Sequence, residues 1–206
     1  MTERRLLLAT RNRHKLREIE GLLSGLPIRI LTLDDLGLAR LEGEDSVEIF
    51  NSFEENALAK ARFYRQHSDL EVVADDSGLC VDALEGGPGV RSRRFAADQR
   101  LPGESEDAAN NRFLLQQLRD IDASGRRAHY RCALACVGER RTLLLSGRVE
   151  GSIVREERGK EGFGYDPLFL LPGHGRTFGE LPPEVKASIS HRAEAIRSFR
   201  RWLEPL

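Results

Sequence analysis

Two adjacent acids, Asp75 and Asp76, follow a short apolar segment at 71–74 and are the first candidates for chemistry. If the chain is extended there, the two side chains point to opposite faces, so only one can face a given site. One acid would then hold structure while the other acts as a general base or binds a metal ion. The alternative is that both carboxylates cap a turn with Ser77 and Gly78.

A polar and mostly basic segment lies between an expected strand and the first turn of an expected helix; it comprises Thr10, Arg11, Asn12, Arg13, His14 and Lys15. The backbone N–H groups of that turn, the helix dipole and Lys15 could together bind phosphate oxygens. An ordinary capped helix with solvated basic residues would have the same composition. The chain has no Walker loop, GxGxxG or GxSxG pattern, which disfavours kinase, Rossmann and serine hydrolase functions.

Carboxylates beside a phosphate site would repel a polyphosphate unless a divalent cation lay between them. The combination of these two motifs therefore implies Mg²⁺. Glu48 and the acids Glu54 and Glu55 are further candidate ligands. Glu55 is more simply explained by a capping box with Ser52 at the start of a helix.

Two later segments have the side chains that recognition of a nucleobase requires, an aromatic face with acceptors and donors nearby. The first is a glycine-rich loop with Phe163, Gly164, Tyr165 and Asp166, and the second has Ser188, Ser190, His191 and Arg192 near a helix start. Each segment by itself could equally be a packed turn or a helix cap.

The composition excludes several classes of protein. The chain of 206 residues has 32 basic and 33 acidic residues, a net charge of −1, which argues against a protein that coats nucleic acid or an anionic membrane. Cys80, Cys132 and Cys136 form no CxxC pair and are expected to be buried. No signal peptide or membrane-length apolar segment is present, so we expect a soluble, cytoplasmic protein.

Hydrophobic patterns predict strands interleaved with helices and one hairpin, which indicates an α/β fold with a mixed sheet. The expected strands are 6–9, 28–33, 71–74, 79–84, 128–137, 141–153 and 167–171, with a loop at 75–78. The expected helices follow Asn12 and Ser52 as N-caps, cover 105–118, and cover 183–203 with a break near 188–190. We expect one domain over 1–206, and the hairpin region near 100–155 would form a lobe of its own.

Taken together, the segments resemble the inosine triphosphate pyrophosphatase family. Six ordered motifs carry the resemblance: LLLATRNRHKLREI, SFEENALAKA, VVADDSGLCVDAL, GGPGVRSRRFA, GFGYDPLF and KASISHRAEA. The resemblance implies an elongated, two-lobed α/β fold, a homodimer, and a nucleotide cleft between the lobes. It also implies Mg²⁺-dependent hydrolysis of deaminated purine nucleoside triphosphates (ITP, dITP, XTP) to the monophosphate and pyrophosphate.

The resemblance assigns roles to individual residues. Asp76 would be the catalytic base and a metal ligand with Glu48, Ser77 would touch the substrate, and the segment from Thr10 to Lys15 would hold the triphosphate. The base and phosphate pocket would be lined by Phe163, Gly164, Tyr165, Asp166, Lys186, His191 and Arg192. Lys15, Lys60 and Lys186 stand where the family uses lysine, which favours phosphate contacts in this arginine-rich chain.

Two residues depart from the family pattern. Arg11 stands where the family has glycine, and Phe50 replaces a common glycine two residues after Glu48. These departures leave open a non-catalytic nucleotide sensor, and a pyrophosphatase for modified pyrimidines is the nearer alternative. For a purine site, Arg192 or His191 would donate to the 6-keto group and Asp166 would accept from N1. That pattern rejects adenine but not guanine.

Overall fold

The computed structural model describes residues 4–203, and contacts divide the chain into two compact units. Unit 1 contains the described residues up to Asp76, Cys132–Gly147, and the described residues from His191 onward. Unit 2 contains Ser77–Arg131 and Arg148–Ser190. The lobe expected near 100–155 coincides with neither unit.

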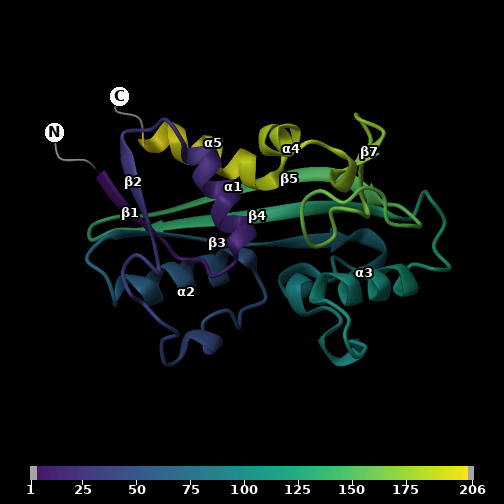
Figure 1. Ribbon diagram of the computed structural model, residues 1–206, viewed down its shortest axis with the longest axis horizontal. Coiled ribbons are helices and arrows are strands. Elements are labelled where there is room, and N and C mark those ends of the chain that lie inside the picture. Colours follow the sequence, from purple (N-terminus) through teal and green to yellow (C-terminus); the bar gives the residue numbers. More distant parts are fainter. Residues whose placement is uncertain (1–3, 204–206) are drawn as a thin grey trace. The chain divides into compact units, whose positions relative to one another are not determined.

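Within residues 4–203, seven strands form one mixed sheet in the order β2-β1-β3-β4-β5-β6-β7. The strands are β1 (Arg4–Leu8), β2 (Ile28–Thr32), β3 (Glu71–Val81), β4 (Arg127–Val137), β5 (Thr142–Ile153), β6 (Phe169–Leu171) and β7 (Arg176–Thr177). β1 pairs in parallel with β2 and β3, whereas β6 pairs antiparallel with β5 and β7. The helices are α1 (Arg13–Leu23), α2 (Phe53–Arg65), α3 (Glu106–Gln117), α4 (Pro183–Ile189) and α5 (His191–Leu203) (Figure 1). The predicted α/β class with a mixed sheet is confirmed.

β3 corrects one expectation from the sequence. We expected two strands with a loop at 75–78, but one strand runs without interruption from Glu71 to Val81 and a short 3₁₀ turn follows at Asp82–Leu84. Gly78 does not form a turn. It is needed because the Ser92 side chain packs closely against its backbone, and a Cβ there would lie 2.4 Å from the Ser92 Oγ. That hydroxyl accepts a hydrogen bond from the Leu79 N–H at 2.9 Å.

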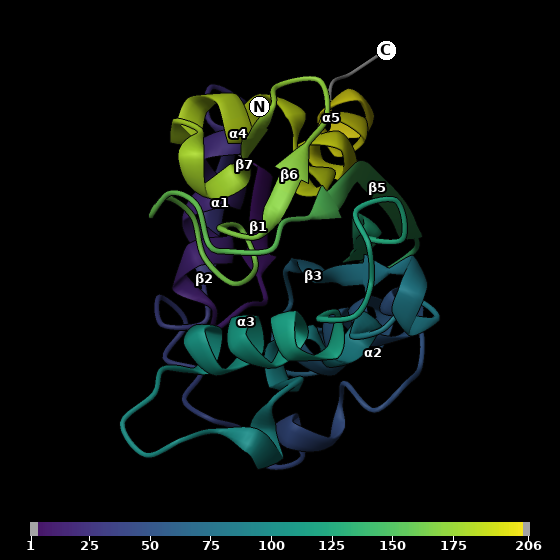
Figure 2. The same ribbon diagram turned by 90° about the vertical axis from the view of Figure 1, so that its right-hand side faces the viewer.

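In unit 1, α1 and α5 lie together on one face of the strands and α2 lies on the other (Figures 1 and 2). The first face has a continuous apolar core whose buried members are Leu6, Leu8, Ile19, Leu23, Val73, Cys132, Leu134, Cys136, Ala195, Ile196 and Phe199. The side chains between them along the strands, such as Leu7 and Val72, are also buried. Both faces of the parallel strands are therefore covered, as parallel sheets require.

Unit 2 has a core of its own. It includes Leu79 and Val81 of β3, Leu114 and Leu118 at α3, and the aromatic rings of Tyr130, Phe169 and Phe178. The Phe169 ring centroid lies 4.7 Å from that of Tyr130 and 5.4 Å from that of Phe178. α3 and α4 lie on opposite faces of this unit's strands (Figure 2).

The predicted helix starts are confirmed. Asn12 caps α1 by accepting from the N–H groups of His14 and Lys15, and Ser52 and Ser105 cap α2 and α3 in the same way. The predicted break in the C-terminal helix falls at Ser190, the C-cap of α4. Side-chain oxygens at these positions satisfy N–H groups that no helical carbonyl can reach.

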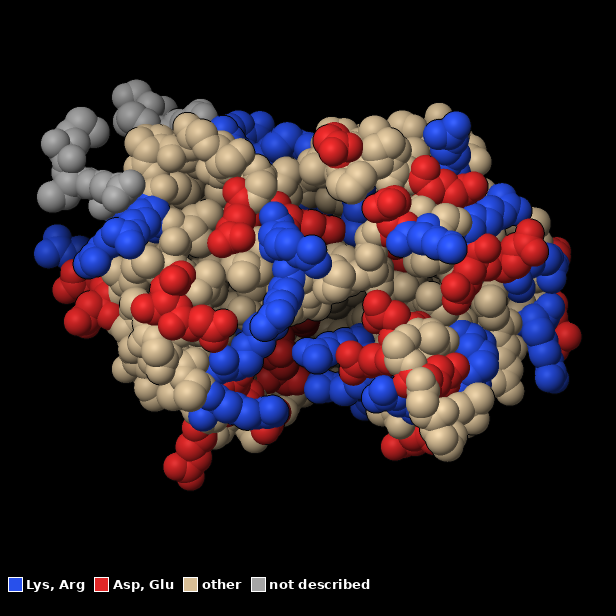
Figure 3. All heavy atoms as spheres, viewed as in Figure 1, with Lys and Arg blue, Asp and Glu red and all other residues tan. Residues whose placement is uncertain are grey.

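The remaining surface and composition features follow the sequence. The three cysteines are buried and unbonded, as expected. No helix between residues 4 and 203 is long and apolar enough to cross a membrane. Acidic and basic side chains are interspersed on the face shown in Figure 3, in keeping with the near-zero net charge.

Two glycines of unit 1 should respond in opposite ways to the addition of one methyl group. A Cβ at Gly147 of β5 would lie 2.0 Å from the His191 carbonyl oxygen, whereas a Cβ at Gly21 of α1 meets nothing within 4 Å. We expect Gly147→Ala to lower the free energy of unfolding by about 1–3 kcal/mol, as overpacking does. Gly21→Ala should raise it by up to about 1 kcal/mol, because alanine favours the helix. Urea denaturation of both variants tests this, and equal effects would contradict it.

Candidate functional site

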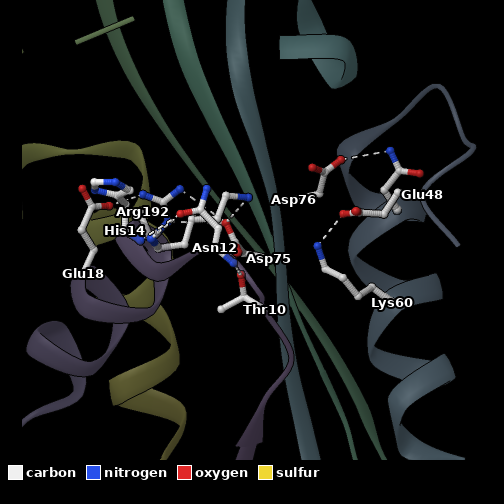
Figure 4. A network of polar contacts seen from close by, with 11 residues as sticks. Thr10, Asn12, His14, Glu18, Glu48, Lys60, Asp75, Asp76 and Arg192 are labelled. Carbon is white, nitrogen blue, oxygen red and sulfur yellow. Dashed lines mark hydrogen bonds and ion pairs between the residues drawn. The ribbon is translucent and has the colours of Figure 1, made fainter. Parts of the chain in front are cut away.

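The site in unit 1 is built on the alternation of side chains along β3. Asp75 points toward α1 and α5, and Asp76 points to the other face, toward α2 (Figure 4). This is the arrangement expected for adjacent residues of an extended strand. The two acids therefore have different partners, although they are neighbours in the sequence.

Asp75 is fully buried and lies within a cluster of charges from three elements. Its Oδ2 accepts from the Lys15 Nζ of α1 at 3.1 Å and from the Arg192 Nε of α5 at 3.4 Å. Arg192 is 1% exposed, and its guanidinium also pairs closely with Glu18. One carboxylate thus joins β3 to both helices on this face, which is the structural role foreseen for one of the two acids.

The charge state of Asp75 follows from this cluster. Burial opposes ionisation, but the positive charges of Lys15, Arg192 and Lys60 outweigh it, and the pKa of Asp75 lies well below its usual range. Asp75 is therefore a permanent anion at neutral pH. A carboxylate that holds its proton so weakly is a counter-ion and a poor general base.

The segment that was expected to bind phosphate forms the N-terminus of α1. The Asn12 side chain caps the helix, and Thr10 Oγ1 accepts from the Asn12 N–H at 3.2 Å. His14 Nδ1 lies 3.1 Å from an Arg17 guanidinium nitrogen, and Arg13 is exposed. Lys15 is the member of this segment that the structure brings to the two acids.

Arg11 has its partners in the segment 38–44. Its guanidinium forms a two-pronged pair with Glu44 at 2.5 and 2.8 Å and donates to the Ala39 carbonyl at 2.8 Å. The hydrogen bond from Arg11 lowers the pKa of Glu44 to about 2. Arg11 therefore ties this loop to the segment that leads to Glu48.

On the α2 face, Asp76 lies beside an amide, a lysine and a second acid. Its Oδ2 accepts from the Asn56 Nδ2 at 3.0 Å. Glu48 forms a close ion pair with Lys60, whose side chain is 13% exposed (Figure 4). Among residues 4–203 no group of three or more His, Cys, Asp or Glu side chains is arranged to hold a metal ion. Within that range, the candidate metal ligands on this face are therefore two acids, Asp76 and Glu48.

The pKa of Asp76 is shifted in the opposite direction to that of Asp75. Burial raises it first, Lys15 and Lys60 lower it, and the negative charge of Glu48 raises it, with a net increase. The pKa of Lys60 is raised, because Glu48, Asp75 and Asp76 outweigh its burial. Of the two adjacent acids Asp75 and Asp76, Asp76 is the one whose proton affinity suits a general base.

Unit 2 contains the aromatic segment. The Asp166 carboxylate accepts from the Lys186 Nζ at 2.5 Å and from the Phe163 N–H at 2.8 Å. The Lys186 ammonium also lies 4.6 Å from the centre of the Phe163 ring. Gly162 is required here, because a Cβ would lie 1.9 Å from the Asp166 Oδ2. The structure thus brings together Phe163, Asp166 and Lys186, three of the residues expected in the base pocket.

Other residues of the expected site have structural partners. The Tyr165 hydroxyl is buried and donates to the Ser92 carbonyl at 2.7 Å, and burial raises its pKa. The Gly164 N–H donates to Asp107 at 2.8 Å. Ser77 follows Asp76 in β3 and belongs to unit 2, whereas His191 is buried at the start of α5 in unit 1.

Three residues with contacts in the site were not predicted from the sequence: Asn56, Glu18 and Glu44. Asn56 had a detectable signal, because it lies on the buried stripe of α2 next to Ala57 and is itself 2% exposed. A polar residue at a buried helical position needs a partner. Glu18 and Glu44 gave no such signal, since isolated glutamates are usually solvated.

Sequence comparisons relate the chain to known proteins over nearly its whole length. The model of the Ham1 family matches residues 6–202. A dITP/XTP pyrophosphatase of Burkholderia pseudomallei (strain K96243) is 46% identical over 198 residues, which cover 95% of this chain and 91% of that protein. A dITP/XTP pyrophosphatase of Thermoanaerobacter sp. (strain X514) is 40% identical over 199 residues, 97% of this chain and 96% of its own.

Solved structures give the same relationship. A HAM1 protein from Coxiella burnetii superimposes with a TM-score of 0.84 at 37% identity and covers 97% of this chain and 98% of its own. A nucleoside-triphosphatase / dITP/XTP pyrophosphatase from Mycobacterium abscessus has a TM-score of 0.71 at 40% identity, with 98% and 100% coverage.

The buried cluster predicts a large cost for removing its anion. Asp75→Asn leaves Lys15 and Arg192 without their buried counter-charge, and we expect the free energy of unfolding to fall by about 3–5 kcal/mol. The folded pKa of Asp75 is lower than the unfolded one, so this contribution is complete above the ordinary aspartate pKa and is lost as the pH falls toward the folded value. Urea denaturation at neutral pH measures it.

The exposed ion pair between Arg93 and Glu106 provides the control. Glu106→Gln should change the urea midpoint little, because exposed pairs contribute little to stability. A loss from Asp75→Asn no larger than that from Glu106→Gln would contradict the assignment of Asp75 as the central counter-ion.

Proposed function

The chain belongs to the Ham1 family, and from that membership we propose that it hydrolyses deaminated purine nucleoside triphosphates to the monophosphate and pyrophosphate. The substrates would be ITP, dITP and XTP, which would be removed from the nucleotide pool before they enter nucleic acid. The names of the relatives support this class of substrate. The observation in this chain that carries the proposal is the contrast between Asp75 and Asp76.

Asp76 is the proposed catalytic base. Its pKa is raised by burial and by Glu48, while the Asn56 amide fixes one of its oxygens. A carboxylate with increased proton affinity can accept a proton from a water molecule that attacks the α-phosphorus. Asp75 cannot take this role, because the positive charges of Lys15, Arg192 and Lys60 hold its proton affinity down.

The donor set of this face fits Mg²⁺. Asp76 and Glu48 offer carboxylate oxygens, the ligands that Mg²⁺ prefers, and the repulsion between them is one that a divalent cation would relieve. We therefore propose Asp76 and Glu48 as its protein ligands. When bound, Mg²⁺ would neutralise phosphate charge and polarise the bond to be cleaved.

The leaving pyrophosphate requires positive charge. Lys15 lies at the N-terminus of α1, where backbone N–H groups add to the charge of its ammonium group, and Lys60 lies beside Glu48. Lysine is a compact charge that can follow phosphate oxygens as they move. We propose that Thr10, Asn12 and Lys15 hold the triphosphate, with Arg11 acting from outside through Glu44.

For the base, we propose Phe163 as the aromatic face, and the neighbouring Asp166 and Lys186 of the same unit as polar groups that read its edge. Hypoxanthine and xanthine share a 6-keto acceptor and an N1 donor, whereas adenine presents the reverse pattern. A reversed pattern leaves buried groups unpaired, which can reduce kcat/KM by about 10⁴-fold. We also propose a homodimer that acts in the cytoplasm on free nucleotides, with neither nucleic acid nor membrane as a partner.

Substitution of the base tests the mechanism. Asp76→Asn keeps the shape of the side chain but cannot accept a proton, so we expect nucleotide binding to persist and kcat for ITP to fall by about 10²–10⁴-fold, the contribution of a positioned general base. The matched control is Asp98→Asn, an exposed aspartate in unit 2. Pyrophosphate release under saturating Mg²⁺ measures both variants. An unchanged kcat in Asp76→Asn would refute the role.

A substrate panel tests the proposed function itself. The purified chain with Mg²⁺ should release pyrophosphate from ITP and XTP and far less from ATP and dTTP, when pyrophosphate and orthophosphate are measured separately. GTP shares both hydrogen-bonding groups used here, so its rate shows whether a separate element rejects the 2-amino group. Orthophosphate release would overturn cleavage at the α-phosphorus. Binding without turnover would indicate a sensor, and preference for a modified pyrimidine would indicate the other alternative.

A further inference from the structure

Asn56 lies in the second turn of α2, with its side chain inside unit 1. Only 2% of its surface is exposed, and asparagine is a poor residue for a helix interior. Its amide oxygen accepts from the Phe50 N–H at 2.9 Å, and its amide nitrogen donates to the Phe50 carbonyl at 3.2 Å. The same nitrogen donates to the Asp76 Oδ2 at 3.0 Å.

These three bonds fix the orientation of the amide. The backbone of Phe50 presents one donor and one acceptor, so only one of the two flipped amide positions satisfies both. That position uses one N–H of the amide and directs the other N–H at Asp76. The backbone of one segment therefore determines where the carboxylate on β3 finds its hydrogen-bond donor.

The segment around Phe50 has little apolar anchoring of its own. Ile49 is 69% exposed and Phe50 is 41% exposed, although both are large hydrophobic residues. Glu48 precedes them directly and is paired with Lys60 of α2. The two hydrogen bonds between Asn56 and Phe50 thus hold the backbone two residues from Glu48, and the hydrogen bond that Asn56 donates to Asp76 holds that carboxylate.

We infer that Asn56 is a positioning residue that sets Asp76 and the segment carrying Glu48 in register with each other. The inference rests on the proposed function, in which these two acids bind Mg²⁺ and Asp76 is the base. Asn56 acts through both acids. Groups that orient metal ligands in this way typically contribute about 10–100-fold to metal affinity or activity.

Unit 2 contains a matched control. Asn110 of α3 is 3% exposed, accepts from the Ala96 N–H at 2.8 Å and donates to the Arg93 carbonyl at 2.9 Å. Like Asn56, it accepts one hydrogen bond from the backbone and donates one to the backbone. Both of these hydrogen bonds are to backbone groups, whereas the third hydrogen bond of Asn56 is to a carboxylate of the site. Asn56→Ala and Asn110→Ala should therefore lower the urea midpoint to a similar extent.

The experiment compares these two variants with the unaltered chain. Binding of Mn²⁺ alone is measured from the loss of the free Mn²⁺ signal in electron paramagnetic resonance, and kcat and KM for ITP are measured with Mg²⁺. We expect Asn56→Ala to lose about 10–100-fold in Mn²⁺ affinity and in kcat with little change in KM. Asn110→Ala should keep all three values. Equal Mn²⁺ affinity and kcat in the two variants would overturn the inference.

Asn56→Asp covers the case in which Asn56→Ala does not fold. Ionised aspartate keeps the shape and the acceptor for the Phe50 N–H, but it donates neither to Asp76 nor to the Phe50 carbonyl, so kcat should still fall while Asn110→Asp retains it. Should the unaltered chain release no pyrophosphate from ITP, the proposed function fails. The Mn²⁺ comparison between Asn56→Ala and Asn110→Ala then decides the positioning role by itself.

Discussion

The buried charge of Asp75 is the interaction on which unit 1 depends. Lys15 comes from α1 and Arg192 from α5, and both reach the same carboxylate oxygen of β3. Burying these cations without this carboxylate would leave positive charge uncompensated in the interior, which is strongly destabilising. The carboxylate thus lets positive charge be kept at the N-terminus of α1, where a phosphate would need it.

The alternation along β3 turns this constraint into a division of roles. Asp75 faces two cations and is held ionised, whereas Asp76 faces an amide and the acid Glu48, with Lys60 close by. The pKa values of Asp75 and Asp76 shift in opposite directions because the two side chains lie on opposite faces of β3. Continuous strand geometry is what produces this difference, so the unbroken course of β3 matters for chemistry as well as for folding.

Much of this could be predicted from the sequence because it is local. Apolar spacing and the caps Asn12, Ser52 and Ser105 determine the helices, and adjacent acids on a strand must diverge. The unbroken β3 could not be predicted, because polar residues and Gly78 usually indicate a turn, and only the distant Ser92 explains that glycine. Glu18 was missed for the same reason, since its partner Arg192 is distant in the chain. Asn56 did carry a signal, because a polar residue at a buried helical position needs a partner.

The ion pair between Arg11 and Glu44 makes the loop before α1 sensitive to ionic strength, whereas the buried cluster around Asp75 is not. The Arg11 side chain is 34% exposed, whereas those of Asp75 and Arg192 are almost fully buried. Dissolved salt screens accessible charges much more than buried ones. Raising the ionic strength therefore weakens the tie between this loop and the segment before Glu48 while the core of unit 1 keeps its charges together. Ionic strength would thus act on the mobility of the loop without loosening the fold beneath it.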